Sequence, residues 1–158
     1  MKTNAVRLLD SLAIPYRLQS YEIDPDDLSA VSVAAKIGLP PEQVFKTLLV
    51  QGDRSGYCFA VVPGNAELDL KALSRLSGNR AMTLVSLKDV EPLTGYIRGA
   101  VTVFGARKTL PAYVDESIDL WDFISVSAGA RGMQVLLAPV DYLRASGGCR
   151  AQIAKPLI

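Results

Sequence analysis

The spacing of apolar residues predicts a series of short helices along the chain. The first runs from Ala5 to Leu12, where apolar side chains recur at helical intervals, and Thr3 or Asn4 is suited to cap it. Pro15 ends this helix, because proline cannot donate the next main-chain hydrogen bond. Further helical patterns follow at about Ser29–Ile37 with Gly38 as a C-terminal cap, at Leu70–Leu76 between Asp69 and Gly78, from Ser86 to Val90, and at Val140–Arg144.

Runs rich in β-branched and aromatic residues predict strands between these helices. Phe45–Val50 and Tyr57–Val62 flank the turn Gly52–Gly56, and together they predict a β-hairpin. Helices and strands alternate irregularly, so we expect a single α+β domain over residues 1–158, built on a mixed β-sheet. The other predicted strands are Tyr16–Ile23, the part of Gly95–Gly105 around Val101 to Phe104, Ile124–Ser127 and Met133–Leu137.

The composition excludes several kinds of chemistry. Lys and Arg total 17 against 16 Asp and Glu, so bulk positive charge cannot carry nucleic-acid binding, although a local basic patch can. The chain has no histidine, which excludes His-based triads and His metal ligands. Its two cysteines cannot form a four-thiolate zinc site. We expect no cofactor, and no metal site built on histidines or on four cysteines.

The sequence also predicts a cytoplasmic protein without a membrane segment. An amphipathic pattern follows Met1 directly, so we expect no signal peptide. No apolar stretch reaches the roughly 18 residues that a membrane-spanning helix requires. Cys58 lies in an apolar strand as a buried thiol, whereas Cys149 follows two glycines and is expected to be more exposed. Two cysteines in such different contexts do not indicate a disulfide framework.

Lys46 is the first candidate for chemistry. Strand alternation places it on the same face as Leu48 and Val50, opposite Phe45 and Thr47. Burying an ammonium group among aliphatic side chains is costly unless it meets an anion or opens to a cleft. Two interpretations remain at this point: a lysine at a strand edge whose amine reaches water, or a clamp for an anion or carbonyl group in a pocket.

Two glycine-rich segments are further candidates. Gly95–Gly105 matches neither a phosphate-binding loop nor a dinucleotide fingerprint. Its glycines indicate either a bulge or a close approach of the backbone to a ligand. Ser125–Gly132 joins two predicted strands, as an ordinary hairpin loop or as a nest of main-chain N–H groups.

Charged residues near these segments suggest a division of the surface. The acidic pairs Asp26–Asp27 and Asp115–Glu116 are interpreted as solvated surface. Basic residues that follow or flank the glycine-rich segments would form an anion-attracting rim if they converge. They are Arg98, Arg107, Lys108, Arg131 and Arg150.

Several segments together resemble one family, in the order in which that family has them. The resemblance covers nearly the whole chain and is to the YbaK/EbsC family, the free-standing relatives of the editing domain inserted in bacterial prolyl-tRNA synthetases. The matching segments are Asn4–Leu9, Ile14–Tyr16, Tyr21–Pro25, Phe45–Val50, Leu68–Leu73, Thr94–Gly99, Leu110–Pro111 and Val126–Gly132.

The resemblance implies a barrel-like mixed sheet surrounded by helices, and hydrolysis of the ester bond of a mischarged tRNA without a metal. It implies action in trans on tRNA(Pro), most of all on Cys-tRNA(Pro), with a prolyl-tRNA synthetase as a partner. In the YbaK branch the substrate's own thiol is thought to attack the ester, which agrees with the absence of histidine. By the same resemblance Lys46 is the catalytic anchor of the aminoacyl-adenosine end, and the substrate-binding residues are Tyr21, Thr47, Gly99, Thr102, Ser127, Gly129 and Gln134.

The chain departs from the family pattern at three places. The loop that usually reads Gly-Gly-x-Ser-Pro-x-Gly is here Gly99–Gly105, Gln134 replaces an acidic residue, and Ile23 replaces a histidine. These changes keep alternatives open: a deacylase for another amino acid such as alanine, a hydrolase for a different small ester, or a non-catalytic module that binds an aminoacyl or nucleotide end.

Overall fold

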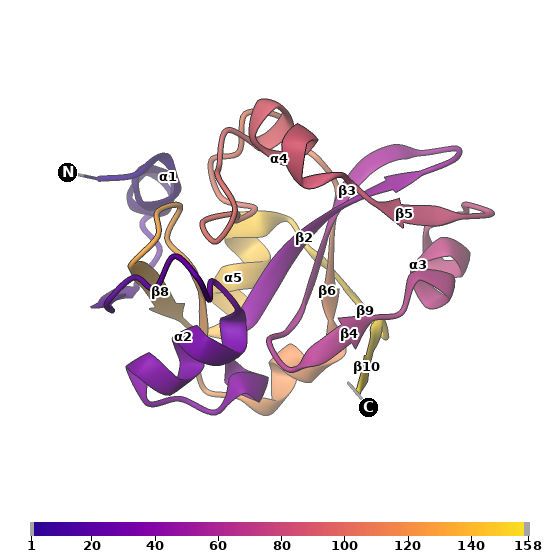
Figure 1. Ribbon diagram of the computed structural model, residues 1–158. Helices are drawn as coiled ribbons and strands as arrows, with labels where there is room; N and C mark the ends of the chain where they lie inside the picture. Colours follow the sequence, from indigo (N-terminus) through magenta and orange to yellow (C-terminus); the bar gives the residue numbers. More distant parts are fainter. Residues whose placement is uncertain (1, 157–158) are drawn as a thin grey trace.

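A long antiparallel hairpin forms the centre of the protein, whose computed structural model describes residues 2–156. Its strands, β2 (Phe45–Gly52) and β3 (Gly56–Pro63), pair over their whole length, from Phe45 opposite Pro63 to Gly52 opposite Gly56. This confirms the predicted hairpin and its turn. Figure 1 shows β2 crossing the front of the molecule between α2 (Ala30–Ile37) and α4 (Leu87–Thr94).

The strands form three sheets, which confirms the α+β prediction and the mixed sheet. The largest has the order β5-β2-β3-β6-β9 and mixes antiparallel with parallel pairs. A three-stranded antiparallel sheet, β1-β8-β7, meets it through one bridge between Val44 and Ser125. The remaining bounds are β1 (Arg17–Ser20), β4 (Ala66–Leu68), β5 (Met82–Leu84), β6 (Ala112–Asp115), β7 (Ile124–Ser127), β8 (Met133–Leu137), β9 (Cys149–Ala151) and β10 (Ala154–Pro156).

Helices α1 and α3 begin at polar residues whose side chains cap them. Thr3 accepts the main-chain N–H of Val6 at the start of α1 (Asn4–Ser11), and Asp69 accepts that of Ala72 at the start of α3 (Leu70–Ser77). Thr3 was one of the two residues predicted to cap α1, and Asp69 was expected near the start of α3. The last helix, α5 (Pro139–Ser146), packs its buried Tyr142 against Phe104, with the ring centroids 5.2 Å apart. Among residues 2–156, no helix is long and apolar enough to span a membrane.

The prediction of a strand around Val101 to Phe104 is wrong. The segment from Gly95 to Gly105 consists of bends and turns, because the buried hydroxyl of Tyr96 donates to the carbonyl of Phe104 and folds the chain back on itself. Gly105 has a φ of 64°, and a side chain there would lie 2.7 Å from the carbonyl oxygen of Asn4. The apolar residues of the segment from Gly95 to Gly105 therefore pack in the core without joining a sheet.

The interpretation of Asp115 as a solvated surface residue is also wrong. Asp115 ends β6 and is only 5% exposed. Its Oδ1 accepts the main-chain N–H groups of Ile153 and Ala154 at 3.1 and 2.9 Å, and its Oδ2 accepts that of Ser117 at 3.1 Å. One buried carboxylate thus holds the segment that joins β9, which pairs with β6, to β10, which pairs with β4.

Replacing Asp115 by alanine should therefore destabilise the fold. Three main-chain donors would lose their acceptor in a buried place, and we expect the free energy of unfolding to fall by about 3 kcal/mol. Denaturant unfolding of Asp115→Ala measures this, with the exposed Asp122→Ala as the matched control, which should change by less than about 0.5 kcal/mol. Equal stability of the two variants would contradict this account of Asp115.

Candidate active site

A cavity of about 490 Å³ lies along one edge of β2. Its lining includes every residue from Val44 to Leu49. The face of a strand contributes every second residue, so an unbroken run of six shows that the edge of the strand, and not one of its faces, borders the cavity. We call residues 45–48 the open edge of β2, because β5 pairs with β2 from Val50 onward and β7 meets it at Val44.

The other walls come from segments far apart in the sequence. The loop before α2 and the start of α2 line one part of the cavity, and the end of β5 with α4 lines another. Figure 1 shows α2 at the beginning of β2 and α4 above the strand. The glycine-rich segment and the three-stranded sheet complete the enclosure. The lining residues from these parts are Asp26, Asp27, Leu28, Ser29, Ala30 and Val33; Leu84, Val85, Leu87 and Val90; and Arg98, Gly99, Val101, Ser127 and Gln134.

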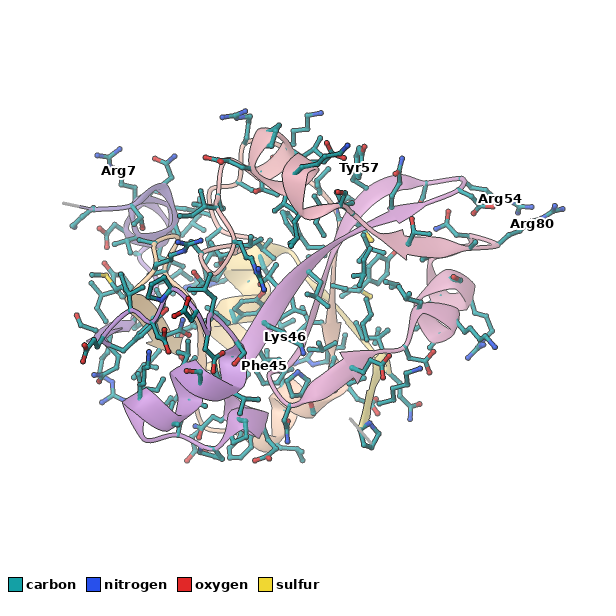
Figure 2. The ribbon with its side chains drawn as sticks, viewed as in Figure 1. Arg7, Phe45, Lys46, Arg54, Tyr57 and Arg80 are labelled. Atoms are coloured by element: carbon teal, nitrogen blue, oxygen red, sulfur yellow. The ribbon has the colours of Figure 1, made fainter. Side chains whose placement is uncertain are left out.

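Lys46 is a half-buried residue of this lining. Figure 2 shows it beside Phe45 at the beginning of β2, far from the hairpin tip that carries Arg54. Its Nζ donates to the carbonyl oxygen of Gly64 at 3.3 Å. Burial lowers the pKa of Lys46, and the nearby carboxylate of Glu67 partly opposes that shift. The structure thus places the lysine at a cavity with one weak main-chain contact, which leaves donor capacity for a ligand.

Gln134 brings a fixed amide group to the cavity. It lies on β8 opposite Ser127 of β7 and is only 4% exposed. The fully buried hydroxyl of Ser125 donates to its Oε1 at 2.8 Å. This bond occupies the acceptor end of the amide, so the donor end is the part available to a bound molecule.

Gly99 and the basic residue Arg98 line the cavity. Gly99 has a φ of 86° and packs under Leu28, where an added Cβ would lie 3.4 Å from that side chain. Arg98 is an exposed lining residue, and the Nε of Arg131 donates to its carbonyl oxygen at 2.8 Å. Two of the predicted rim residues are therefore adjacent, whereas Arg150 lies on β9, remote from β2 in the sheet order, and pairs with Asp119.

Five of the eight predicted site residues line the cavity together: Lys46, Thr47, Gly99, Ser127 and Gln134. The other three do not line it. The Tyr21 main chain pairs with Gly132, and its ring lies 5.9 Å from the amine of Lys36. Gly129 has a φ of 89° and is packed against Tyr96, which a side chain at this position would approach within 2.9 Å. Thr102 is fully buried, and its hydroxyl has no hydrogen-bond partner among residues 2–156.

Sequence reasoning missed the walls formed by α2 and α4. The apolar residues Val33, Val85 and Val90 gave no signal beyond an amphipathic pattern. Asp26 and Asp27 were interpreted as solvated surface; they are exposed, and they also border the cavity. Only tertiary structure brings these segments to one place.

The cavity can bind and orient a polar ester without supplying a strong nucleophile. No group of His, Cys, Asp or Glu side chains suited to a metal ion occurs among residues 2–156. Cys58 is buried in β3, and burial raises its thiol pKa to about 11. Charged and polar side chains line the cavity together with main-chain groups, and its cationic and N–H donors suit electrostatic stabilisation of a bound carbonyl. The polar side chains are those of Lys46, Arg98, Asp26, Asp27, Gln134, Ser29, Thr47 and Ser127.

Comparison with known proteins gives a consistent result. Residues 24–145 match the family model of the aminoacyl-tRNA editing domain. The chain is 43% identical over 152 residues to EbsC of Enterococcus faecalis, which is provisionally named a Cys-tRNA(Pro)/Cys-tRNA(Cys) deacylase. The aligned region covers 96% of this chain and 93% of that protein. It is 29% identical over 89 residues to the multifunctional Ser/Thr-tRNA deacylase ProXp-y of Escherichia coli, over 56% of this chain and 53% of that one.

A solved structure shares the fold. A crystal structure described provisionally as a trans-editing enzyme for prolyl-tRNA synthetase superposes with a TM-score of 0.83, at 23% identity, over 98% of this chain and 99% of that one. The protein belongs to the family of aminoacyl-tRNA editing domains. The predicted resemblance to the YbaK/EbsC family is thereby confirmed.

The lowered pKa of Lys46 predicts how ligand binding depends on pH. If the ammonium form binds the ligand, affinity is complete below the pKa of Lys46 and falls as pH rises through it, before the ordinary lysine value of 10.5 is reached. Binding of a non-hydrolysable aminoacyl-adenosine analogue, titrated from neutral pH to 10.5, measures this. Lys46→Met should bind more weakly and lose this pH dependence; an unchanged profile in Lys46→Met would assign the titration to another group.

Proposed function

We propose that the protein is an aminoacyl-tRNA deacylase that hydrolyses the ester of a mischarged tRNA, acting in trans. The observation that carries this proposal is the cavity itself, in a member of the editing family. Four separate segments bring five of the expected site residues to its lining: Lys46, Thr47, Gly99, Ser127 and Gln134. An ester of a small amino acid with the terminal adenosine offers a carbonyl, an amine and ribose hydroxyls, which are groups that these residues can bind.

In this proposal the residues position the ester and stabilise charge. The ammonium of Lys46 and main-chain N–H groups at the cavity favour negative charge on the ester oxygens. For a cysteinyl ester, the substrate thiol attacks the carbonyl carbon, the bond to the ribose oxygen breaks, and the thiol proton passes to that oxygen as a thiolactone forms. The protein then contributes orientation and exclusion of water, which can lower a barrier without a protein nucleophile.

Cys-tRNA(Pro) is the substrate that we propose first. EbsC, whose provisional name includes this substrate, is 43% identical over nearly the whole chain. The alternative is that the protein hydrolyses the ester of another amino acid, such as alanine. This alternative rests on Gln134 in place of an acidic residue and on the changed sequence of the loop Gly99–Gly105. A second candidate function, a non-catalytic module that holds an aminoacyl end, is favoured by the same loop.

Further proposals concern partners and place. We take residues 1–158 as one editing domain that receives the acceptor end of the tRNA and works with a prolyl-tRNA synthetase. We place this activity in the cytoplasm, where charged tRNA is used. No metal or cofactor takes part in the proposed reaction. Arg98, which lines the cavity, and Arg131, which donates to the Arg98 carbonyl, are suited to the phosphates of the acceptor end.

The test is deacylation of a panel of charged tRNA(Pro) species carrying cysteine, alanine and serine. We expect the wild-type protein to release at least one amino acid faster than buffer, and Lys46→Ala to be slower by about tenfold or more, because a charged donor at the carbonyl is lost. Lys71→Ala is the matched control, since Lys71 is exposed on α3 away from the cavity. Release equal to that in buffer for every tRNA would reject the deacylase, and tight binding of the aminoacyl-adenosine analogue in that case would establish the binding module.

A further inference from the structure

The open edge of β2 leaves main-chain groups facing the cavity. On its other side β2 pairs with β3 along its whole length. On the cavity side, β5 begins to pair at Val50, and the bridge to β7 lies at Val44. Among residues 2–156, no strand pairs with residues 45–48 on this side, and the cavity occupies the gap.

Two hydrogen bonds fix which main-chain groups point into this gap. The carbonyl of Val44 accepts the N–H of Gly64, so the main-chain N–H and C=O groups of Val44 and of every second residue after it point towards β3. The carbonyl of Leu49 accepts the N–H of Val85 at 3.0 Å, so the main-chain groups of Leu49 and of every second residue before it point away from β3. Both bonds agree that Thr47 directs its N–H and its carbonyl oxygen towards the cavity.

No strand of residues 2–156 pairs with these two main-chain groups of Thr47, which are therefore available to a bound molecule. In an antiparallel sheet, two residues opposite each other exchange two N–H···O bonds, one in each direction. Thr47 is half-buried, and main-chain polar groups in such a place are normally paired. The natural complement is a molecule that carries an N–H donor and a carbonyl acceptor separated by one carbon atom.

We propose that the main chain of Thr47 binds the aminoacyl group as a neighbouring strand residue would. The carbonyl oxygen of Thr47 accepts a hydrogen bond from the α-amino group, and its N–H donates to the carbonyl oxygen of the ester. An aminoacyl ester has the required arrangement, since its amine and its carbonyl flank the α-carbon. This inference rests on the proposed function and names the part of the substrate that all amino acids share.

The proposal assigns different tasks to different walls of the cavity. Thr47 recognises the α-amine and the carbonyl, whatever the side chain is, and its N–H meets the oxygen that gains negative charge when the ester is attacked. Discrimination between amino acids is then left to the remaining walls, including the Gln134 amide that Ser125 orients. Lys46, the preceding residue on the strand, adds its ammonium charge at the same ester oxygens.

The decisive variant replaces the main-chain N–H of Thr47 by an ester oxygen, through incorporation of the α-hydroxy analogue of threonine at this position. The side chain is retained, and no donor of the β2–β3 ladder is lost because the main-chain groups of Thr47 face away from β3. The Lys46 carbonyl, which faces β3, becomes an ester carbonyl and a weaker acceptor, so denaturant unfolding of the variant is measured beside its activity. We expect kcat for tRNA deacylation to fall by at least about tenfold, as for other single donors to a developing oxyanion. The same replacement at Thr109, exposed and outside the cavity, should leave kcat unchanged.

A second measurement uses the wild-type protein, so it does not depend on the folding of a variant. The substrate is the tRNA carrying the deaminated acyl group, in which hydrogen replaces the α-amine, and each rate is divided by its rate in buffer. We expect a loss of at least about tenfold in kcat/KM relative to the aminoacyl-tRNA, because the bond to the Thr47 carbonyl is absent.

The outcomes separate this inference from the proposed function. Full activity of the α-hydroxy Thr47 protein, or equal relative rates with the deaminated substrate, would overturn the role of Thr47 while leaving the deacylase intact. Failure of the wild-type protein to release any amino acid would instead reject the deacylase on which this inference rests.

Discussion

The arrangement of the site depends on how β2 is paired. Along its whole length the strand is held by β3, but its other side is covered only at the two ends, by β7 at Val44 and by β5 from Val50. The gap between them provides the cavity with a rigid wall. Because the register with β3 is fixed over eight pairs, the direction of every group along this wall is fixed as well. Lys46 and Thr47 are positioned by sheet pairing, before any contact with a ligand.

The features that the sequence could predict are those with a local physical cause. The β2–β3 hairpin follows from two apolar runs that flank a short polar turn, and the caps Thr3 and Asp69 follow from side chains that accept nearby N–H groups. The lysine in an apolar strand was a candidate because its burial is costly unless a cleft or partner lies close. In the structure Lys46 borders the cavity, in agreement with that argument.

The features that could not be predicted depend on contacts between distant residues. Strands β4, β9 and β10 have three residues each and no pattern of their own, so tertiary pairing alone defines them. The residues Val101 to Phe104 favour a strand by composition, yet a bond from Tyr96 to Phe104 bends the chain. Asp115 looked like a polar loop residue because its main-chain partners lie 38 and 39 positions further along the chain.

The anchoring of the segment 149–156 has a consequence for which strand edges the protein exposes. This segment supplies β9 to the central sheet and β10 to β4. A partly unfolded protein in which the segment is detached keeps the β2–β3 pair but exposes the edges of β6 and β4, and unpaired edges invite association with other chains. The buried carboxylate of Asp115, which holds this segment through two main-chain N–H groups, therefore also protects the protein against aggregation.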